Sequence, residues 1–412
     1  MSATDANRVE GATAVRRLAD WDGARLRALA GEFETPLYVL DLDRVHENAT
    51  RLLRAFPDAD VSYAVKANAT RGVLETVRDA GLGAECGSAG EVRRALDAGF
   101  PGERVRYTAV NPPARDLDEV VSLSHDHDLV LTVDSVDTFE RVADRDFAGR
   151  LCVRVNPGVG AGHHAKVTTG DAPQFGVPYD RAAALCAEVR ERGFDLVGLH
   201  AHAGSGISGE GLAAHAELVR RLSALGREVG DLDFVAVGGG FGVPCRPEDP
   251  PLDLDAVAAA TREAFDCEAR LAIEPGRYVV ADAGVLLAAT TAVTETPETT
   301  VVGCDAGMTT LLRPALYDAY HEVRVLAPDA ADRPTARCLV AGPVCETADV
   351  LARDRPLPEP AVDDVLAVGN AGAYAYEMAS QYNSRPRPAV VSLAGDPLVR
   401  RETLADLTRL EH

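Results

Sequence analysis

Eight short apolar stretches recur along the first two thirds of the chain, and they constrain its fold more than any other feature. They lie at 61–68, 81–88, 104–110, 129–135, 151–157, 195–205, 233–240 and 270–276. The segments between them, such as TRGVLETVRDAG, carry apolar residues at helical spacing and end at glycine, as a helix C-cap does. Eight strands that alternate with helices over about 215 residues predict a (β/α)8 barrel of the TIM type. Strand counting leaves a doubly wound open sheet as the alternative.

The residue composition and the hydrophobic periodicity change after the last of these stretches, which indicates a second domain. Runs such as TTVVGCDAG and DVLAVGNAGAY are rich in Thr and Val and show little helical periodicity, so 281–412 is predicted to be a mainly antiparallel β-domain. Residues 15–33 are predicted to form one helix and 35–45 a strand. Because a terminal strand must pair with another strand, we expect 1–45 to join the β-domain. That domain is then discontinuous around a barrel at 46–280.

The balance of charge excludes several classes of partner. The 412 residues carry 64 acidic and 42 basic groups, for a formal net charge of −22. Such a surface repels nucleic acid and anionic lipid, so we expect neither as a partner. No apolar run approaches the ~20 residues of a membrane span, and the opening MSATDANRVE is polar, unlike a secretory signal. We therefore expect a cytoplasmic protein.

Lysine is nearly absent, since 40 of the 42 basic residues are arginine. An acidic excess with so little lysine suggests a protein held soluble in concentrated salt, where the Debye length falls to ~3 Å. On this composition we hypothesise a halophilic source. A free energy of unfolding that is highest at low salt concentration would contradict the hypothesis.

Polar residues follow the predicted strands at the ends where a barrel carries its active site. They are Lys66 after the first strand, His202 and Ser205 at the sixth, Gly238, Gly239 and Gly240 at the seventh, and Glu274 at the eighth. A buried lysine, unlike an arginine, can lose its proton and attack a carbonyl carbon. Glycines after the seventh strand lie where barrels bind phosphate through backbone N–H groups, and Ser205 adds a hydroxyl donor.

An amine, a phosphate cradle, a carboxylate and a flat ring together describe a site for pyridoxal 5'-phosphate. In such a site Lys66 binds the cofactor covalently. Glu274 keeps the pyridine nitrogen protonated, so that the ring can accept electrons from the substrate.

Nine motifs carry a resemblance to a known family. They are YAVKAN, CGSAGE, HAHAGSG, GGGFG, EPGR, DAGM, RPALYDAYHEV, GPVCETADVLARDR and NAGAYAYEMASQYNSRPRP, spread over residues 35–395. On these motifs the chain resembles the barrel-type (alanine racemase-like, fold type III) pyridoxal-phosphate decarboxylases, and within them the branch that acts on diaminopimelate. The resemblance implies a carboxy-lyase that converts meso-2,6-diaminopimelate to L-lysine and carbon dioxide, the last step of lysine biosynthesis.

The resemblance also implies a role for each matching residue. Lys66 would carry the cofactor, His202 would stack on its ring, and Glu274 would pair with the ring nitrogen. The cofactor phosphate would be surrounded by Ser205, Gly238, Gly239, Gly240, Gly276, Arg277 and Tyr374. The substrate would contact Arg277, Arg313, Tyr317, Glu346 and Tyr374. Cys345 is similar to the family's proton donor, and Cys345 and Glu346 would enter the site from the second subunit of a homodimer with two shared sites.

The chemistry of the substrate agrees with these residue types. The far end of meso-diaminopimelate carries an ammonium and a carboxylate, which need one acidic and at least one bidentate basic partner. Glu346 and the pair Arg277 and Arg313 fit these needs, with Tyr317 as an orienting hydroxyl. Ornithine has no second carboxylate, so Arg313 is the sharpest specificity signal in the chain.

Several other interpretations stay open on the sequence alone. One is an ornithine, arginine or carboxynorspermidine decarboxylase on the same fold, and another is a cofactor-binding regulatory homologue without activity. His200 and His202, two apart on a strand, could ligate zinc, but without a recognisable third ligand we expect no metal. Lys166 is the only rival to Lys66, in a Gly- and Thr-rich loop whose GHHAK run we expect to be solvated.

Overall fold

The computed structural model describes residues 14–159, 161–162, 174–207 and 210–411. The interpretations offered for Lys166 and for the neighbouring histidines lie outside these residues. The chain divides into two compact units, and each is described by itself. The barrel unit comprises His46–Gly242 and Leu252–Val279, and the β unit comprises Met1–Val45, Val243–Pro251 and Val280–His412.

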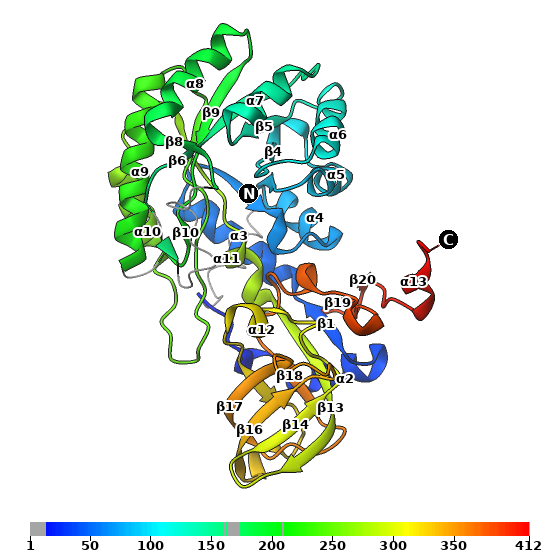
Figure 1. Cartoon of the computed structure of the whole chain (residues 1–412). Helices are drawn as coiled ribbons and strands as arrows, with labels where there is room; N and C mark the ends of the chain where they lie inside the picture. Colours follow the sequence, from blue (N-terminus) through cyan, green and yellow to red (C-terminus); the bar gives the residue numbers. More distant parts are fainter. Residues whose placement is uncertain (1–13, 160, 163–173, 208–209, 412) are drawn as a thin grey trace. The chain divides into compact units, whose positions relative to one another are not determined.

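The barrel unit is built on a closed ring of parallel strands (Figure 1). They are β2 (Asp60–Ala64), β3 (Gly83–Cys86), β4 (Val105–Tyr107), β5 (Val130–Val133), β6 (Arg150–Asn156), β9 (Leu196–His200), β11 (Phe234–Ala236) and β12 (Arg270–Ile273). Pairing between β5 and β6, with Val130 opposite Arg150, closes the ring. All eight predicted strands are present, so the prediction of a (β/α)8 barrel is confirmed and the open sheet is wrong.

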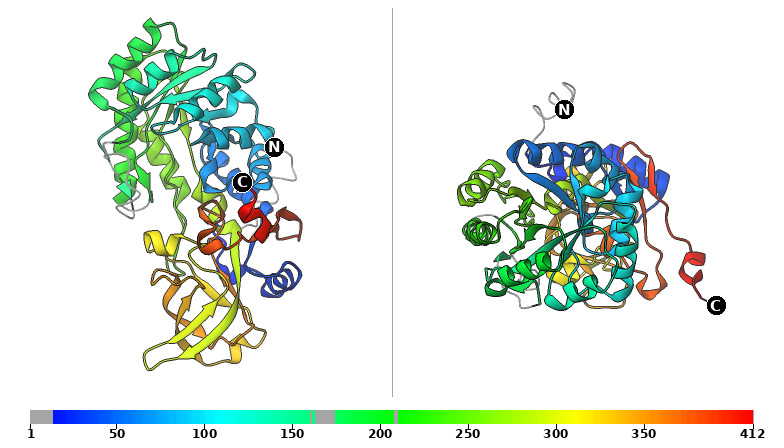
Figure 2. Two further views of the ribbon diagram at one scale, coloured as in Figure 1. Left: turned by 45° about the vertical axis from the view of Figure 1, so that its right-hand side comes forward. Right: turned by 90° about the horizontal axis from the view of Figure 1, so that it is seen from above.

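Helices follow the strands and surround the ring, as the view from above in Figure 2 shows. They are α3 (Leu42–Ala55), α4 (Arg71–Asp79), α5 (Ala89–Asp97), α6 (Ala114–Ser124), α7 (Val136–Ala143), α8 (Tyr179–Glu191), α9 (Glu210–Val229), α10 (Leu254–Ala264) and α11 (Arg277–Val280). Two of them begin at a serine cap: Ser88 accepts from the Glu91 N–H and Ser135 from the Thr138 N–H. Such caps end a strand-to-helix connection within a few residues and keep the rim compact. None of the described helices is long and apolar enough to cross a membrane.

The β unit is a mainly antiparallel sheet that begins with an N-terminal strand. Its strands are β1 (Leu37–Leu40), β13 (Gly284–Glu295), β14 (Thr300–Cys304), β15 (Val323–Val325), β16 (Thr335–Ala341), β17 (Val350–Pro358), β18 (Val365–Val368), β19 (Ala389–Ser392) and β20 (Pro397–Val399). Strand β1 lies between β13, which it pairs antiparallel, and β19, which it pairs parallel. The fold class predicted for the second domain is confirmed.

Short helices complete the β unit. They are η1 (Leu18–Asp20), α2 (Gly23–Phe33), η5 (Ala281–Ala283), α12 (Arg313–Tyr317), η6 (Ala330–Asp332), η7 (Tyr376–Met378), η8 (Tyr382–Ser384) and α13 (Leu404–Thr408). Residues 15–33 do not form one helix, so that prediction is wrong. Trp21 has an extended backbone, and Asp22 then starts α2 by accepting hydrogen bonds from the N–H groups of Ala24 and Arg25. An aspartate satisfies otherwise unpaired N–H groups best at a helix N-terminus, which explains the break.

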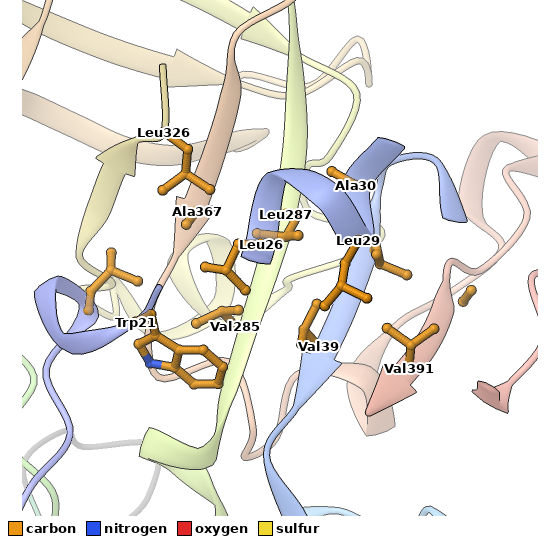
Figure 3. Close-up of a cluster of buried hydrophobic side chains, with 13 residues drawn as sticks. Trp21, Leu26, Leu29, Ala30, Val39, Val285, Leu287, Leu326, Ala367 and Val391 are labelled. Atoms are coloured by element: carbon orange, nitrogen blue, oxygen red, sulfur yellow. The ribbon is translucent and has the colours of Figure 1, made fainter. Parts of the chain in front are cut away.

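Helix α2 is held to the sheet by a hydrophobic cluster (Figure 3). Leu26 and Leu29 of the helix are fully buried against Val39 of β1 and Val285 and Leu287 of β13. Burying one leucine stabilises a fold by about 1.5–3 kcal/mol, so these contacts fix the N-terminal segment firmly.

Residues Val243–Pro251 are grouped with the β unit, whereas the sequence-based boundaries left them inside the barrel. Two contacts account for this. The Asn370 amide donates to the Pro244 carbonyl at 2.9 Å, and the Arg17 guanidinium donates to the Arg246 carbonyl at 2.9 Å.

A buried hydrogen bond joins helices α9 and α10 of the barrel unit. His215 Nε2 lies 2.8 Å from Thr261 Oγ1, and that hydroxyl donates its proton to the Val257 carbonyl at 2.7 Å. Thr261 Oγ1 must therefore accept a hydrogen bond from His215 Nε2–H. Burial lowers the pKa of His215 to about 4.

We predict that His215→Gln makes the protein less sensitive to acid. The pKa of His215 is lower in the folded state than its ordinary 6.5. The contribution of neutral His215 to the free energy of unfolding is therefore fully present above pH 6.5 and is lost as the pH falls toward 4. Between pH 7 and pH 5 the loss in the wild type is about 2 kcal/mol. Glutamine can donate the same hydrogen bond without titrating. Urea unfolding of both proteins at the two pH values measures the difference, and an equal loss in both would contradict the prediction.

Candidate active site

Lys66 is held by a buried carboxylate that the sequence reasoning missed. It lies in η2 (Val65–Ala67), the turn that follows β2, and its Nζ is 3.1 Å from Glu85 Oε2. Glu85 stands in β3 opposite Ala64, so strand pairing brings the two side chains to the same rim. The Lys66 side chain is 51% exposed and that of Glu85 only 3%. The buried carboxylate thus orients the amine, while about half of the lysine side chain remains exposed to solvent.

Glu274 and His200 form a buried pair at the ends of two strands. Glu274 follows β12 and His200 ends β9, and His200 Nε2 lies 2.9 Å from Glu274 Oε2. Burial alone would raise the pKa of Glu274, but the attraction and hydrogen bond of His200 outweigh burial and lower it, so the carboxylate is ionised. A buried carboxylate with a second oxygen available is suited to hold a protonated ring nitrogen.

His202 has a different environment from His200. Strand β9 ends at His200, so the alternation that would have placed both rings on one face does not continue. Instead the Gly239 N–H donates to His202 Nδ1 at 3.2 Å, which requires a lone pair on that nitrogen. Burial, with the nearby positive charges of Lys66 and Arg154, lowers the pKa of His202 to about 3. The ring is neutral and flat, as stacking on an aromatic cofactor requires.

The run Gly238–Gly240 forms a turn that only glycine permits. Gly238 and Gly240 have φ values of +72° and +100°, in the left-handed region. A Cβ on Gly239 would lie 2.3 Å from the Glu274 carbonyl oxygen. The turn is also tied to the neighbouring loop of β10 (Gly204–Ser205), because Gly240 accepts hydrogen bonds from the N–H groups that follow Ser205, at residues 206 and 207.

These features fit pyridoxal phosphate. A side-chain-free turn beside the Ser205 hydroxyl provides close backbone approach for a phosphate. Gly276 and Arg277 follow Glu274 closely in the chain, and α11 begins at Arg277. The barrel unit therefore brings together the lysine, the ring, the carboxylate and the glycine turn that the sequence placed at separate strand ends.

Arg154 is a further charged residue that sequence reasoning did not select. It lies in β6 and is buried, and its guanidinium is 5.4 Å from the ring centroid of Phe175. Burial lowers the pKa of Arg154, while Glu85, Glu274 and Asp134 act in the opposite direction. A signal for this residue was present, since an arginine in the middle of a buried strand is rare unless it is paired.

The remaining predicted residues belong to the β unit. Arg313 and Tyr317 are the two ends of α12, with the buried guanidinium 5.8 Å from the tyrosine ring centroid. Tyr374 follows β18 and has a left-handed backbone, with φ +53°. Cys345 and Glu346 lie together on the exposed turn between β16 and β17.

Comparisons with known proteins agree with this architecture. The family model described as pyridoxal-dependent decarboxylase, pyridoxal binding domain, matches residues 42–281. The diaminopimelate decarboxylase of Methanothermobacter thermautotrophicus is 40% identical over 407 residues, which cover 94% of each chain. That of Deinococcus radiodurans is 38% identical over 94% of this chain and 98% of its own. The crystal structure of Helicobacter pylori diaminopimelate decarboxylase complexed with L-lysine superposes with a TM-score of 0.86 at 31% identity, covering 94% of this chain and 99% of that one.

A closed barrel with a lysine at its rim, together with the family match, places the chain among the pyridoxal-dependent decarboxylases. A lysine/ornithine decarboxylase from Vibrio vulnificus shares the fold at 21% identity, with a TM-score of 0.78. The identity of 38–40% over nearly the whole length indicates a narrower family within this class. The chain belongs to the diaminopimelate decarboxylases.

We predict that Gly240→Ala weakens the binding of pyridoxal phosphate about tenfold. A Cβ at this left-handed position would lie 2.7 Å from the Gly204 carbonyl oxygen and push the turn away from the Ser205 loop. Titration of the cofactor-free protein, followed by absorbance, measures the affinity. Gly242→Ala is the matched control, because a Cβ there meets nothing within 4 Å, and it should bind as the wild type does. Equal affinities for all three proteins would contradict the role given to the turn.

Proposed function

We propose that this chain is a pyridoxal 5'-phosphate-dependent carboxy-lyase that removes carbon dioxide from meso-2,6-diaminopimelate and releases L-lysine. The observation that supports this most is the 40% identity to a diaminopimelate decarboxylase over 94% of both chains. The rim of the barrel supplies the chemistry that such a reaction needs. A lysine amine, a buried ionised carboxylate, a neutral imidazole and a glycine turn lie at the ends of its strands.

The cofactor would be held by Lys66, His202, Ser205, Gly238–Gly240, Glu274, Gly276, Arg277 and Tyr374. When bound, pyridoxal phosphate supplies an electron sink for the carbanion that is left when the carboxylate departs. Glu274 stabilises positive charge at the ring nitrogen, and His200 keeps Glu274 ionised. Glu85 holds the Lys66 amine close to the strand ends, so that the lysine reaches the reacting centre with little loss of conformational freedom.

The substrate would be bound mainly by residues of the β unit. Arg313, which is buried and packed near Tyr317, would bind the distal carboxylate with Arg277, and Glu346 would bind the distal ammonium. Tyr317 and Tyr374 would orient the chain of the substrate. Cys345 Sγ–H would donate the proton that replaces the lost carboxylate. A distal carboxylate is what ornithine lacks, so Arg313 favours diaminopimelate over the diamine-forming alternatives.

We further propose that the enzyme is a cytoplasmic homodimer with shared sites, from a source that maintains concentrated salt. Cys345 and Glu346 are both exposed in the single chain, as residues that serve a partner's site would be. The net charge of −22 supports the salt proposal.

Carbon dioxide release from meso-diaminopimelate tests the function. The wild type should release it and form L-lysine, whereas Lys66→Ala should do neither and should lose the visible absorbance of the bound cofactor. Cys345→Ala should retain the cofactor and be slow, because its proton donor is missing. Borohydride trapping followed by peptide mapping should label Lys66. A label elsewhere, or turnover of ornithine in preference to diaminopimelate, would refute the proposal.

The same assay tests the shared site. Lys66→Ala and Cys345→Ala chains mixed in equal amounts should recover about a quarter of the wild-type rate, because half of the dimers pair the two variants and hold one intact site. A mixture no more active than its components would exclude a site built from two chains.

A further inference from the structure

The turn that carries Cys345 and Glu346 is lined along its length by a second segment of the β unit, residues 382–385. Tyr382 Oη donates to Glu346 Oε1 at 2.7 Å, and the Asn383 amide nitrogen lies 3.9 Å from Cys345 Sγ. The Arg385 guanidinium donates to the Pro343 carbonyl at 3.0 Å. The two segments thus lie antiparallel to each other.

The backbone of residues 382–385 is shaped for this contact. Asn383 and Ser384 have φ values of +57° and +52°, so the segment makes a tight left-handed turn. Its base is closed by Glu402. That carboxylate accepts from the Gln381 amide at 3.0 Å and from the Arg387 N–H at 2.9 Å. The C-terminal stretch therefore fixes the loop that reaches Glu346.

The backbone of the turn 342–349 is held by a buried carboxylate, independently of residues 382–385. Asp349 is buried, and its carboxylate accepts hydrogen bonds from the backbone N–H groups of Met308 and Val344. Gly307 and Gly342 pack so closely on this carboxylate that a Cβ on either would overlap it. Because Asp349 fixes the backbone of the turn, removing the Tyr382 hydroxyl should alter the Glu346 side chain without displacing the turn.

We propose that Tyr382 is a positioning residue that orients Glu346 and thereby sets the recognition of the distal ammonium of the substrate. This inference depends on the proposed function. Glu346 and Tyr382 are both exposed, and an exposed glutamate samples several rotamers unless a partner selects one. The hydroxyl occupies Oε1 and leaves Oε2 to accept from the ammonium. Consistent with this contact, the hydrogen bond to Glu346 raises the pKa of the Tyr382 phenol.

Tyr382→Phe tests the proposal, because it removes the hydroxyl and keeps the ring. We expect the KM for meso-diaminopimelate to rise about fivefold, as the loss of one exposed hydrogen bond of ordinary strength implies, with kcat within a factor of about two. The inhibition constant of L-lysine, which retains the distal ammonium, should rise by the same factor. Alkylation of Cys345 by iodoacetamide, followed by peptide mass, should proceed at the wild-type rate, since the turn is unmoved.

A double-mutant cycle with Glu346→Gln is the matched control. In the Glu346→Gln background, Tyr382→Phe should change KM by less than about twofold, because there is no carboxylate left to orient. An unchanged KM in Tyr382→Phe, a fall in kcat alone, or equal effects in both backgrounds would each overturn the inference while the proposed function stands. A wild type that does not act on meso-diaminopimelate would overturn the proposed function, and this inference with it.

Discussion

Closure of the ring between β5 and β6 is the constraint on which the site depends. All strands of the ring are parallel, so closing it gathers every carboxyl end at one rim. Lys66, Glu85, His200 and Glu274 come from four different strands and meet there only because the strands lie side by side in register. An open sheet would have left β5 and β6 as edges.

Polar side chains at this rim are arranged in pairs. The amine of Lys66 faces the carboxylate of Glu85, and His200 faces Glu274. Removing the Lys66 amine would leave the buried Glu85 carboxylate without this charged partner, which destabilises the fold. The Gly239 N–H donates to His202 Nδ1 and thereby stabilises the neutral form of that ring. The rim can therefore present one positive, one negative and one neutral group to the same bound molecule.

Much of this was predictable from the order of residues, because strand ends are visible in the sequence. Lys66, His202, Glu274 and the glycine run follow apolar stretches directly, and the fold brings the ends of such stretches together. Their partners were not predictable in the same way. Glu85 was missed, and His200 was weighed only as a zinc ligand and not as the partner of Glu274. A partner is fixed by the register between strands, which periodicity within one strand does not reveal.

Other errors had local causes. The helix expected over 15–33 is interrupted because Asp22 caps the N-terminus of α2. The prediction followed the apolar spacing on both sides of Asp22 and did not take this capping preference into account. The residues that line the Cys345 turn lie about 40 positions further along the chain, at 382–385. No motif spacing indicated that the two segments would lie against each other.

The position of β1 in its sheet has a consequence for how the molecule is made. This strand leaves the ribosome early, yet one of its neighbours is β19, which begins at Ala389. At typical rates of synthesis the interval is on the order of tens of seconds. During this interval the barrel is synthesised, and the edge of Leu37–Leu40 that pairs with β19 has no native hydrogen-bonding partner. A nascent chain of this design is exposed to strand-mediated association during that interval, and a chaperone that covers the apolar segment Leu37–Leu40 would have its longest opportunity then.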